Sequence, residues 1–94
     1  MRKADKLLQK WTNNVPKEAR VQDVETFINH FFPGMWHQER TSHIVITCEA
    51  LKPFREYKPN GELTVAVKGG KRVKGFYIKD LVKAVRLLEE LGEL

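Results

Sequence analysis

The chain has 94 residues, of which 41% are hydrophobic and 31% charged, and its formal net charge is +5 at pH 7. That length accommodates one domain and excludes a second core. The single cysteine, Cys48, excludes an internal disulfide and a cysteine-based zinc site. No apolar run approaches the ~20 residues of a membrane span, and the charged N-terminus has no signal-peptide core. We therefore expect residues 1–94 to form one domain in a reducing cytoplasm, with no membrane partner.

Two amphipathic helices are predicted in the first third of the chain. The first is expected over Lys3 to Trp11, within an additional N-terminal segment 1–14, and its apolar stripe is Ala4, Leu7, Leu8 and Trp11. It should stop by Asn13-Asn14, since Pro16 blocks its continuation. The second helix should end at Pro33-Gly34, and its stripe is Val21, Val24, Phe27, Ile28 and Phe31.

Three strands and a final helix are expected after these helices. The strands are Met35–Arg40, Ser42–Cys48 and Leu63–Val67, with a tight link at Thr41-Ser42 and a polar loop over about 50–62. A basic glycine turn then runs from Lys68 to Gly75, and the last helix from about Ile78 to Leu91. Short links favour antiparallel pairing, with helices on one face of the sheet and water on the other. The predicted fold class is a two-layer α+β domain.

One histidine at the start of the second strand is the first candidate for chemistry. Alternation sends Ile44, Ile46 and Cys48 to one face of the strand, and His43, Val45 and Thr47 to the other. If the first face is the core, then His43 stands on an open face, where an imidazole can take or give a proton. Lys68 alternates onto the same face. We expect it to form a cationic rim beside His43, together with Lys71, Arg72 and Lys74.

An imidazole beside fixed positive charge suits cleavage of RNA. RNA breaks when a base removes the 2′-hydroxyl proton and that oxygen attacks the neighbouring phosphate, with cations stabilising the developing charge. His43 is the candidate base or acid, and the four basic residues of the rim are candidates for binding the phosphate. This chemistry requires no metal or other cofactor, and DNA, which lacks the 2′-hydroxyl, would be refused.

Each of these residues also has a simpler interpretation. A solitary histidine on a strand is more often a solvated surface residue, and a run such as 71–74 is usually a solvated loop. Ser42 is more often a turn-former or hydrogen-bonding residue than a nucleophile. Phe76 and Tyr77 are expected to pack at the start of the last helix. Alternation of Trp36 and His37 sends one inward and one outward, and a buried Trp36 would leave His37 as a second acid or base.

The segment Val21 to Thr47 resembles the HicA family of bacterial toxins. The resemblance rests on Asp23-Val24-Glu25 in the helix, on the strand Met35 to Arg40, and on Thr41-Ser42-His43-Ile44. The stretch Leu63 to Leu88 resembles the family's later strand, basic glycine turn and final helix. The first helix is similar to that of longer members. The resemblance implies a double-stranded-RNA-binding-like fold and a ribonuclease toxin that cuts messenger RNA and is neutralised by a HicB antitoxin.

Carried over by position, the family's catalytic histidine falls on His43 and its preceding serine on Ser42, which we place with the RNA-binding residues. The family's glycine before the serine is Thr41 here, its second histidine is Ile44, and Lys68 stands where many members have a histidine. The resemblance also implies that an antitoxin would cover the open face, and an acidic surface on it would complement the basic rim.

Two functions of different classes follow from the sequence. The first is an endoribonuclease in which His43 transfers a proton. The second is a non-catalytic module of the same fold that binds RNA or an antitoxin. They differ in their dependence on His43, because only the enzyme loses its rate when that side chain is removed. A DNA-binding regulator fits the charge, but the sequence carries no helix-turn-helix signature.

Overall fold

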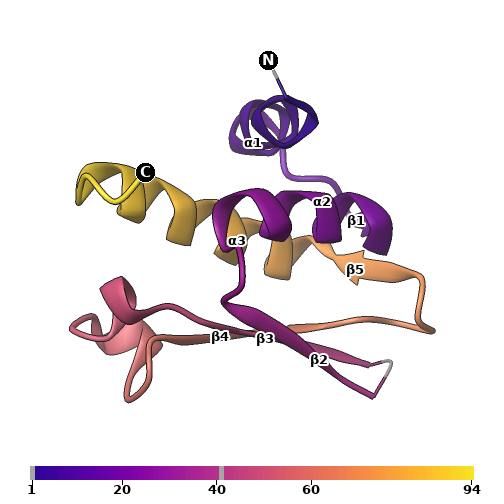
Figure 1. Ribbon diagram of the computed structural model, residues 1–94. Coiled ribbons are helices and arrows are strands. Elements are labelled where there is room, and N and C mark those ends of the chain that lie inside the picture. The colour runs from indigo at the N-terminus through magenta and orange to yellow at the C-terminus, as the bar shows by residue number, and fades with distance from the viewer. Residues whose placement is uncertain (1, 41) are drawn as a thin grey trace.

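The computed structural model describes residues 2–40 and 42–94 (Figure 1). Met1 and Thr41 lie outside these residues, so the expectations for the start of the N-terminal segment and for the Thr41 side of the tight link are not addressed by it. The helices are α1 (Lys3–Asn13), α2 (Val21–Phe31) and α3 (Gly75–Glu90). The strands are β1 (Glu18–Arg20), β2 (Trp36–Glu39), β3 (His43–Thr47), β4 (Glu62–Ala66) and β5 (Arg72–Lys74). The predicted α+β class is confirmed.

Strands β2, β3 and β4 form an antiparallel sheet in that order, with β3 in the centre. Helices α2 and α3 cover one face of this sheet, as Figure 1 shows, and the apolar residues of β3 point into the core between them. Ile44 and Ile46 are fully buried there, and Cys48 is also buried, as the alternation predicted. The other side is the open face, formed by His37, Glu39, His43, Val45, Thr47, Glu62, Thr64 and Ala66.

Helix α1 lies across α2 and α3 on the side away from the sheet (Figure 1). The predicted stripe is the buried one, and Trp11 packs against Phe27 of α2 with ring centroids 5.3 Å apart. The Arg86 side chain of α3 donates a hydrogen bond to the Thr12 hydroxyl at 3.0 Å. Since Trp11 is only 2% exposed, the additional N-terminal helix shares the core of the domain.

The two-stranded sheet of β1 and β5 was not expected from the sequence, where 68–75 was predicted as a turn. Its register pairs Glu18 with Lys74 and Arg20 with Arg72. The ladder continues into both following helices, because the Val21 N–H donates to the Lys71 carbonyl and the Gly75 N–H to the Lys17 carbonyl. The first N–H groups of a helix need acceptors from outside it. The residues just before β5 and β1 therefore supply backbone acceptors to α2 and α3, and the structure shows no side-chain cap on either helix among the described residues.

The last helix consequently begins at Gly75, three residues before the predicted start at Ile78. A Cβ atom on Gly75 would overlap the carbonyl oxygen of Pro16, so glycine permits the close approach of the segment before β1 to the start of α3. The polar loop predicted over 50–62 contains two 3₁₀ turns, η1 (Glu49–Leu51) and η2 (Arg55–Tyr57), whose Leu51 and Tyr57 are buried.

Candidate active site on the open face of the sheet

His43 begins β3 and lies exposed on the open face. Its neighbours across the sheet are Glu39 of β2 and Ala66 of β4. Directly opposite residues of an antiparallel pair have Cβ atoms about 4.5–5.5 Å apart and point to the same side. The imidazole therefore has a carboxylate-bearing residue on one flank. The small side chain on the other flank leaves room beside the ring.

The position of the imidazole is set by the residue before it. The Ser42 hydroxyl and Nδ1 of His43 lie 2.9 Å apart and share a hydrogen bond. The Ser42 backbone carbonyl accepts a hydrogen bond from the Val67 N–H at 2.7 Å, which fixes this residue to the chain beyond β4. With Nδ1 occupied by the hydroxyl, Nε2 is the ring nitrogen left to exchange a proton with a bound molecule.

His37 lies on the same face, diagonally from His43 across Glu39 and Val45. The preceding residue, Trp36, points to the helix side of the sheet, where its indole N–H donates a hydrogen bond to the Asn29 side-chain oxygen at 3.0 Å. The sequence left open which of these two side chains points inward, and the structure shows that it is Trp36. Nε2 of His37 is 3.1 Å from a carboxylate oxygen of Glu39, so this imidazole already has an acceptor or counter-charge.

Val45 departs from the simple alternation. It lies on the open face between His37 and Thr64, yet it is only 7% exposed. It occupies the middle of the central strand, with a neighbouring strand on each side. The open face therefore has an apolar centre between its polar ends.

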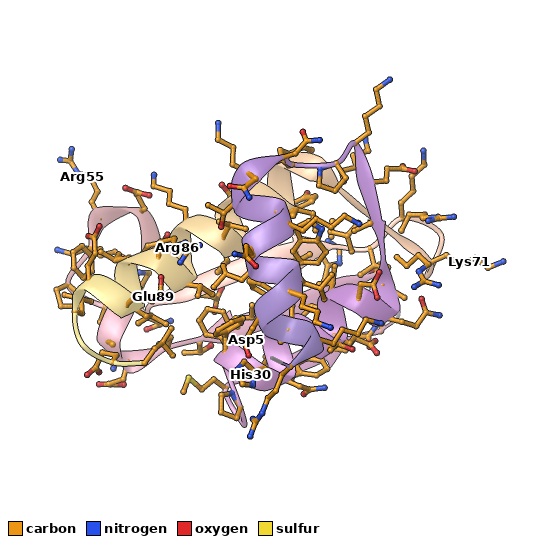
Figure 2. All side chains as sticks on the ribbon, turned by 90° about the horizontal axis from the view of Figure 1, so that it is seen from above. Asp5, His30, Arg55, Lys71, Arg86 and Glu89 are labelled. Atoms are coloured by element: carbon orange, nitrogen blue, oxygen red, sulfur yellow. The ribbon has the colours of Figure 1, made fainter. Side chains whose placement is uncertain are left out.

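The basic residues predicted as a rim do not line one common hollow, although Lys68 and Arg72 are paired through their backbones. Lys68 and Lys74 line one hollow of about 320 Å³ with Ala66, the residue of β4 that pairs with His43. Lys71 lies in the glycine turn with its side chain directed away from the body of the protein (Figure 2). Arg72 lines a separate hollow with Trp11 and Arg20.

The hollow at Arg72 also contains Asp23, which is in the first turn of α2. Burial of this carboxyl favours its neutral form, but the Lys3 ammonium at 2.9 Å and the Arg20 guanidinium outweigh that effect and lower its pKa below the ordinary value of 3.8. Asp23 is thus an ionised structural partner that ties α1 to the start of α2.

The glycine turn positions Lys68 through the backbone. Gly69 and Gly70 both have positive φ, at 59° and 70°, a conformation that glycine adopts without steric cost. The Lys68 N–H and carbonyl both pair with Arg72, which closes the turn. Within residues 2–40 and 42–94, the amides of Gly69 and Gly70 donate to no backbone carbonyl.

Phe76 was expected to pack at the start of the helix, and this expectation is wrong. Its side chain is 57% exposed, whereas Tyr77 packs partly against the core. Phe76 lines the same hollow as Lys68 and Lys74. The signal in the sequence was its position directly after a basic segment, where an unburied aromatic residue is typical of nucleic-acid-binding surfaces.

The described parts of the chain hold no group of three or more histidine, cysteine, aspartate or glutamate side chains arranged to bind a metal ion. Among the same residues, none of the helices has both the length and the apolar character that crossing a membrane requires. Comparison with protein-family models, curated proteins and solved structures gave no match.

Proposed function

We propose that the chain is an endoribonuclease of the HicA type, a toxin that cleaves messenger RNA with His43 as a proton-transfer group. The observation that carries the proposal is an exposed imidazole, oriented by Ser42, on an open sheet face that adjoins the lysines of one hollow. A surface with these features provides an imidazole for proton transfer and cations for a phosphodiester. The resemblance of the segments around His43 to that family supports the same function.

In the proposed reaction, a base removes the 2′-hydroxyl proton and the freed oxygen forms a bond to the adjacent phosphorus. The bond from phosphorus to the 5′-oxygen breaks, an acid protonates that oxygen, and a 2′,3′-cyclic phosphate remains. Nε2 of His43 serves one of these two proton transfers. His37 is the candidate for the other, because it lies diagonally on the same face. Lys68 and Lys74 stabilise the additional negative charge at phosphorus.

The proposed partners are RNA and a HicB-type antitoxin that covers the open face. Encounter with an acidic antitoxin surface would be accelerated by the net charge of +5. No small-molecule cofactor enters the proposal. The proposed reaction takes place in the cytoplasm, where messenger RNA is accessible.

The experiment is cleavage of a defined single-stranded RNA by the purified chain in EDTA, compared with His43→Ala. We expect the variant to cut about 10²- to 10⁴-fold more slowly and to retain its affinity for RNA. His30→Ala is the matched control, because His30 lies near Asp5 between α1 and α2, away from the open face (Figure 2). An RNA with 2′-deoxyribose at the cleaved position should resist cutting.

The alternative is a non-catalytic RNA-binding or protein-interaction module. If neither wild type nor His43→Ala cuts RNA but both bind it equally, the module is favoured and the enzyme is rejected. Equal cutting rates of the two proteins would remove His43 from the mechanism.

A further inference from the structure

The surface where β5 passes into α3 combines an exposed aromatic ring with unpaired positive charge. Phe76 is in the first turn of α3 and is the most exposed large hydrophobic residue among those described. A single exposed apolar side chain is ordinary on a protein surface. Phe76 differs because it lines two adjoining hollows, which also share Lys74. The lysines that line these two hollows are Lys17, Lys68, Lys74 and Lys79.

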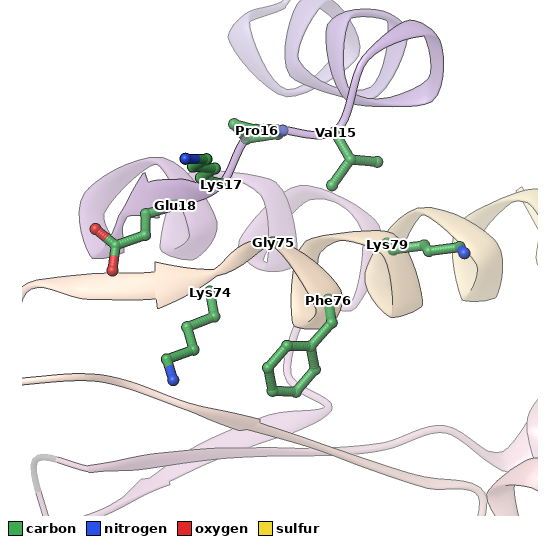
Figure 3. Close-up of a pocket in the computed structure, with 8 residues that line it drawn as sticks. All are labelled: Val15, Pro16, Lys17, Glu18, Lys74, Gly75, Phe76 and Lys79. Carbon is green, nitrogen blue, oxygen red and sulfur yellow. The ribbon is translucent and has the colours of Figure 1, made fainter.

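None of these four lysines forms an ion pair with another described residue. Among the described residues, Glu18, which lies opposite Lys74, is the single acidic residue that lines either hollow. The charge around Phe76 is therefore predominantly positive, with four lysines against one glutamate. Figure 3 shows the Phe76 ring and the Lys74 side chain extending from the strand–helix junction toward the sheet.

The ring is also held in place. Its centroid lies 4.1 Å from that of Tyr77, with an angle of 38° between the planes, and Tyr77 itself packs against the core. An aromatic surface that is already ordered loses little conformational freedom when a second ring stacks on it. Proteins bind single-stranded nucleic acid with positive charge along the path of its phosphate backbone and with fixed aromatic rings on which bases stack.

We propose that Phe76 is a stacking platform for an unpaired base of single-stranded RNA, with Lys74 and Lys68 contacting the phosphates between that base and His43. The proposed route passes over the edge strand β4, whose Ala66 lines the hollow with Phe76 and pairs directly with His43. The choice of RNA rests on the proposed function. The choice of a single strand rests on Phe76, since bases within a duplex are stacked on one another and offer no free face.

The test measures binding of the full chain to a short single-stranded RNA that 2′-O-methylation makes resistant to cleavage. Phe76→Leu keeps an apolar side chain but removes the ring, and we expect about tenfold weaker binding, within the range for loss of one stacked base. Phe76→Trp should bind at least as tightly as wild type. Leu91→Ala is the matched control, because Leu91 is also exposed but follows the opposite end of the same helix.

Two further measurements separate stacking from charge. Replacing single bases of the RNA by abasic sites should weaken wild-type binding at one position and leave Phe76→Leu unaffected there. Lys74→Ala should reduce the slope of log affinity against log salt by about 0.7, the contribution of one phosphate contact to a single strand. If Lys74→Ala weakens binding while Phe76→Leu does not, the surface is electrostatic only and the stacking proposal is overturned. A surface that binds acidic protein but not this RNA would overturn it as well.

Cleavage assays keep this proposal distinct from the proposed function. Phe76→Leu should raise KM and leave kcat nearly unchanged, whereas His43→Ala should lower kcat. RNA binding that depends on Phe76, with cleavage that ignores His43, would support the stacking subsite and reject the catalytic assignment. Cleavage that depends on His43, with wild-type affinity in Phe76→Leu, would reject the stacking subsite alone.

Discussion

The hydrogen bond between Ser42 and His43 provides a quantitative test of how the proposed site is organised. The change is Ser42→Ala, which removes the hydroxyl 2.9 Å from Nδ1. It leaves intact the backbone bond from the Val67 N–H to the Ser42 carbonyl, so we expect the strand pairing to persist. A hydrogen bond between neutral groups contributes about 0.5–1.5 kcal/mol net, and this one is exposed to solvent. Ser42→Ala should therefore lower kcat by about 2- to 12-fold, toward the smaller value.

The same reasoning predicts how the two residues combine. If Ser42 acts by orienting the imidazole, its removal has no effect once His43 has been replaced by alanine. The assay is a double-mutant cycle on RNA cleavage, with KM and kcat determined separately for each of the four proteins. Ser42→Thr retains a hydroxyl and should recover most of the rate. The orienting role is refuted if Ser42→Ala slows cleavage equally in the wild-type and His43→Ala backgrounds.

Two further predictions concern the framework around the site. Gly75→Ala should lower the free energy of unfolding by about 2 kcal/mol in urea titrations, because a Cβ there overlaps the Pro16 carbonyl oxygen. An unchanged urea midpoint would contradict the close approach of Pro16 to Gly75. The lowered pKa of Asp23 contributes stability that is complete above the unfolded value of about 3.8 and is lost as pH falls through the folded value. The difference in unfolding free energy between wild type and Asp23→Asn should therefore be largest near neutral pH and shrink in acid. A difference independent of pH would show that the Asp23 charge does not stabilise the fold.

Helix and strand periodicity predicted most of the fold. The stripes of α1 and α2 were identified residue by residue, because burial against a core repeats at helical spacing over three turns. The three long strands were predicted within about a residue at each end, since alternation along β3 and β4 distinguishes a core face from an open one. His43 was placed on the open face by the same argument, and the structure confirms its exposure.

Strands β1 and β5 were missed for a physical reason. Each has three residues with a single buried position, Ala19 or Val73, and one apolar residue gives no period to recognise. The start of α3 was missed as a consequence. A helix that takes its acceptors from the backbone of a neighbouring strand needs no serine, threonine or aspartate at its cap, and Lys74 stands there instead.

The division of the basic rim shows how strand pairing decides which charges cooperate. Arg72 and Lys74 are two residues apart on one strand, and sequence spacing alone would group them. Pairing with β1 places Arg72 opposite Arg20, where the neighbouring hollow contains the ionised Asp23. Lys74 stands at the passage into α3, opposite Glu18, and forms no ion pair with any described residue. The lysines available to a phosphate are therefore concentrated on the Phe76 side of β5, in a hollow that reaches Ala66 of the edge strand β4, the partner of His43.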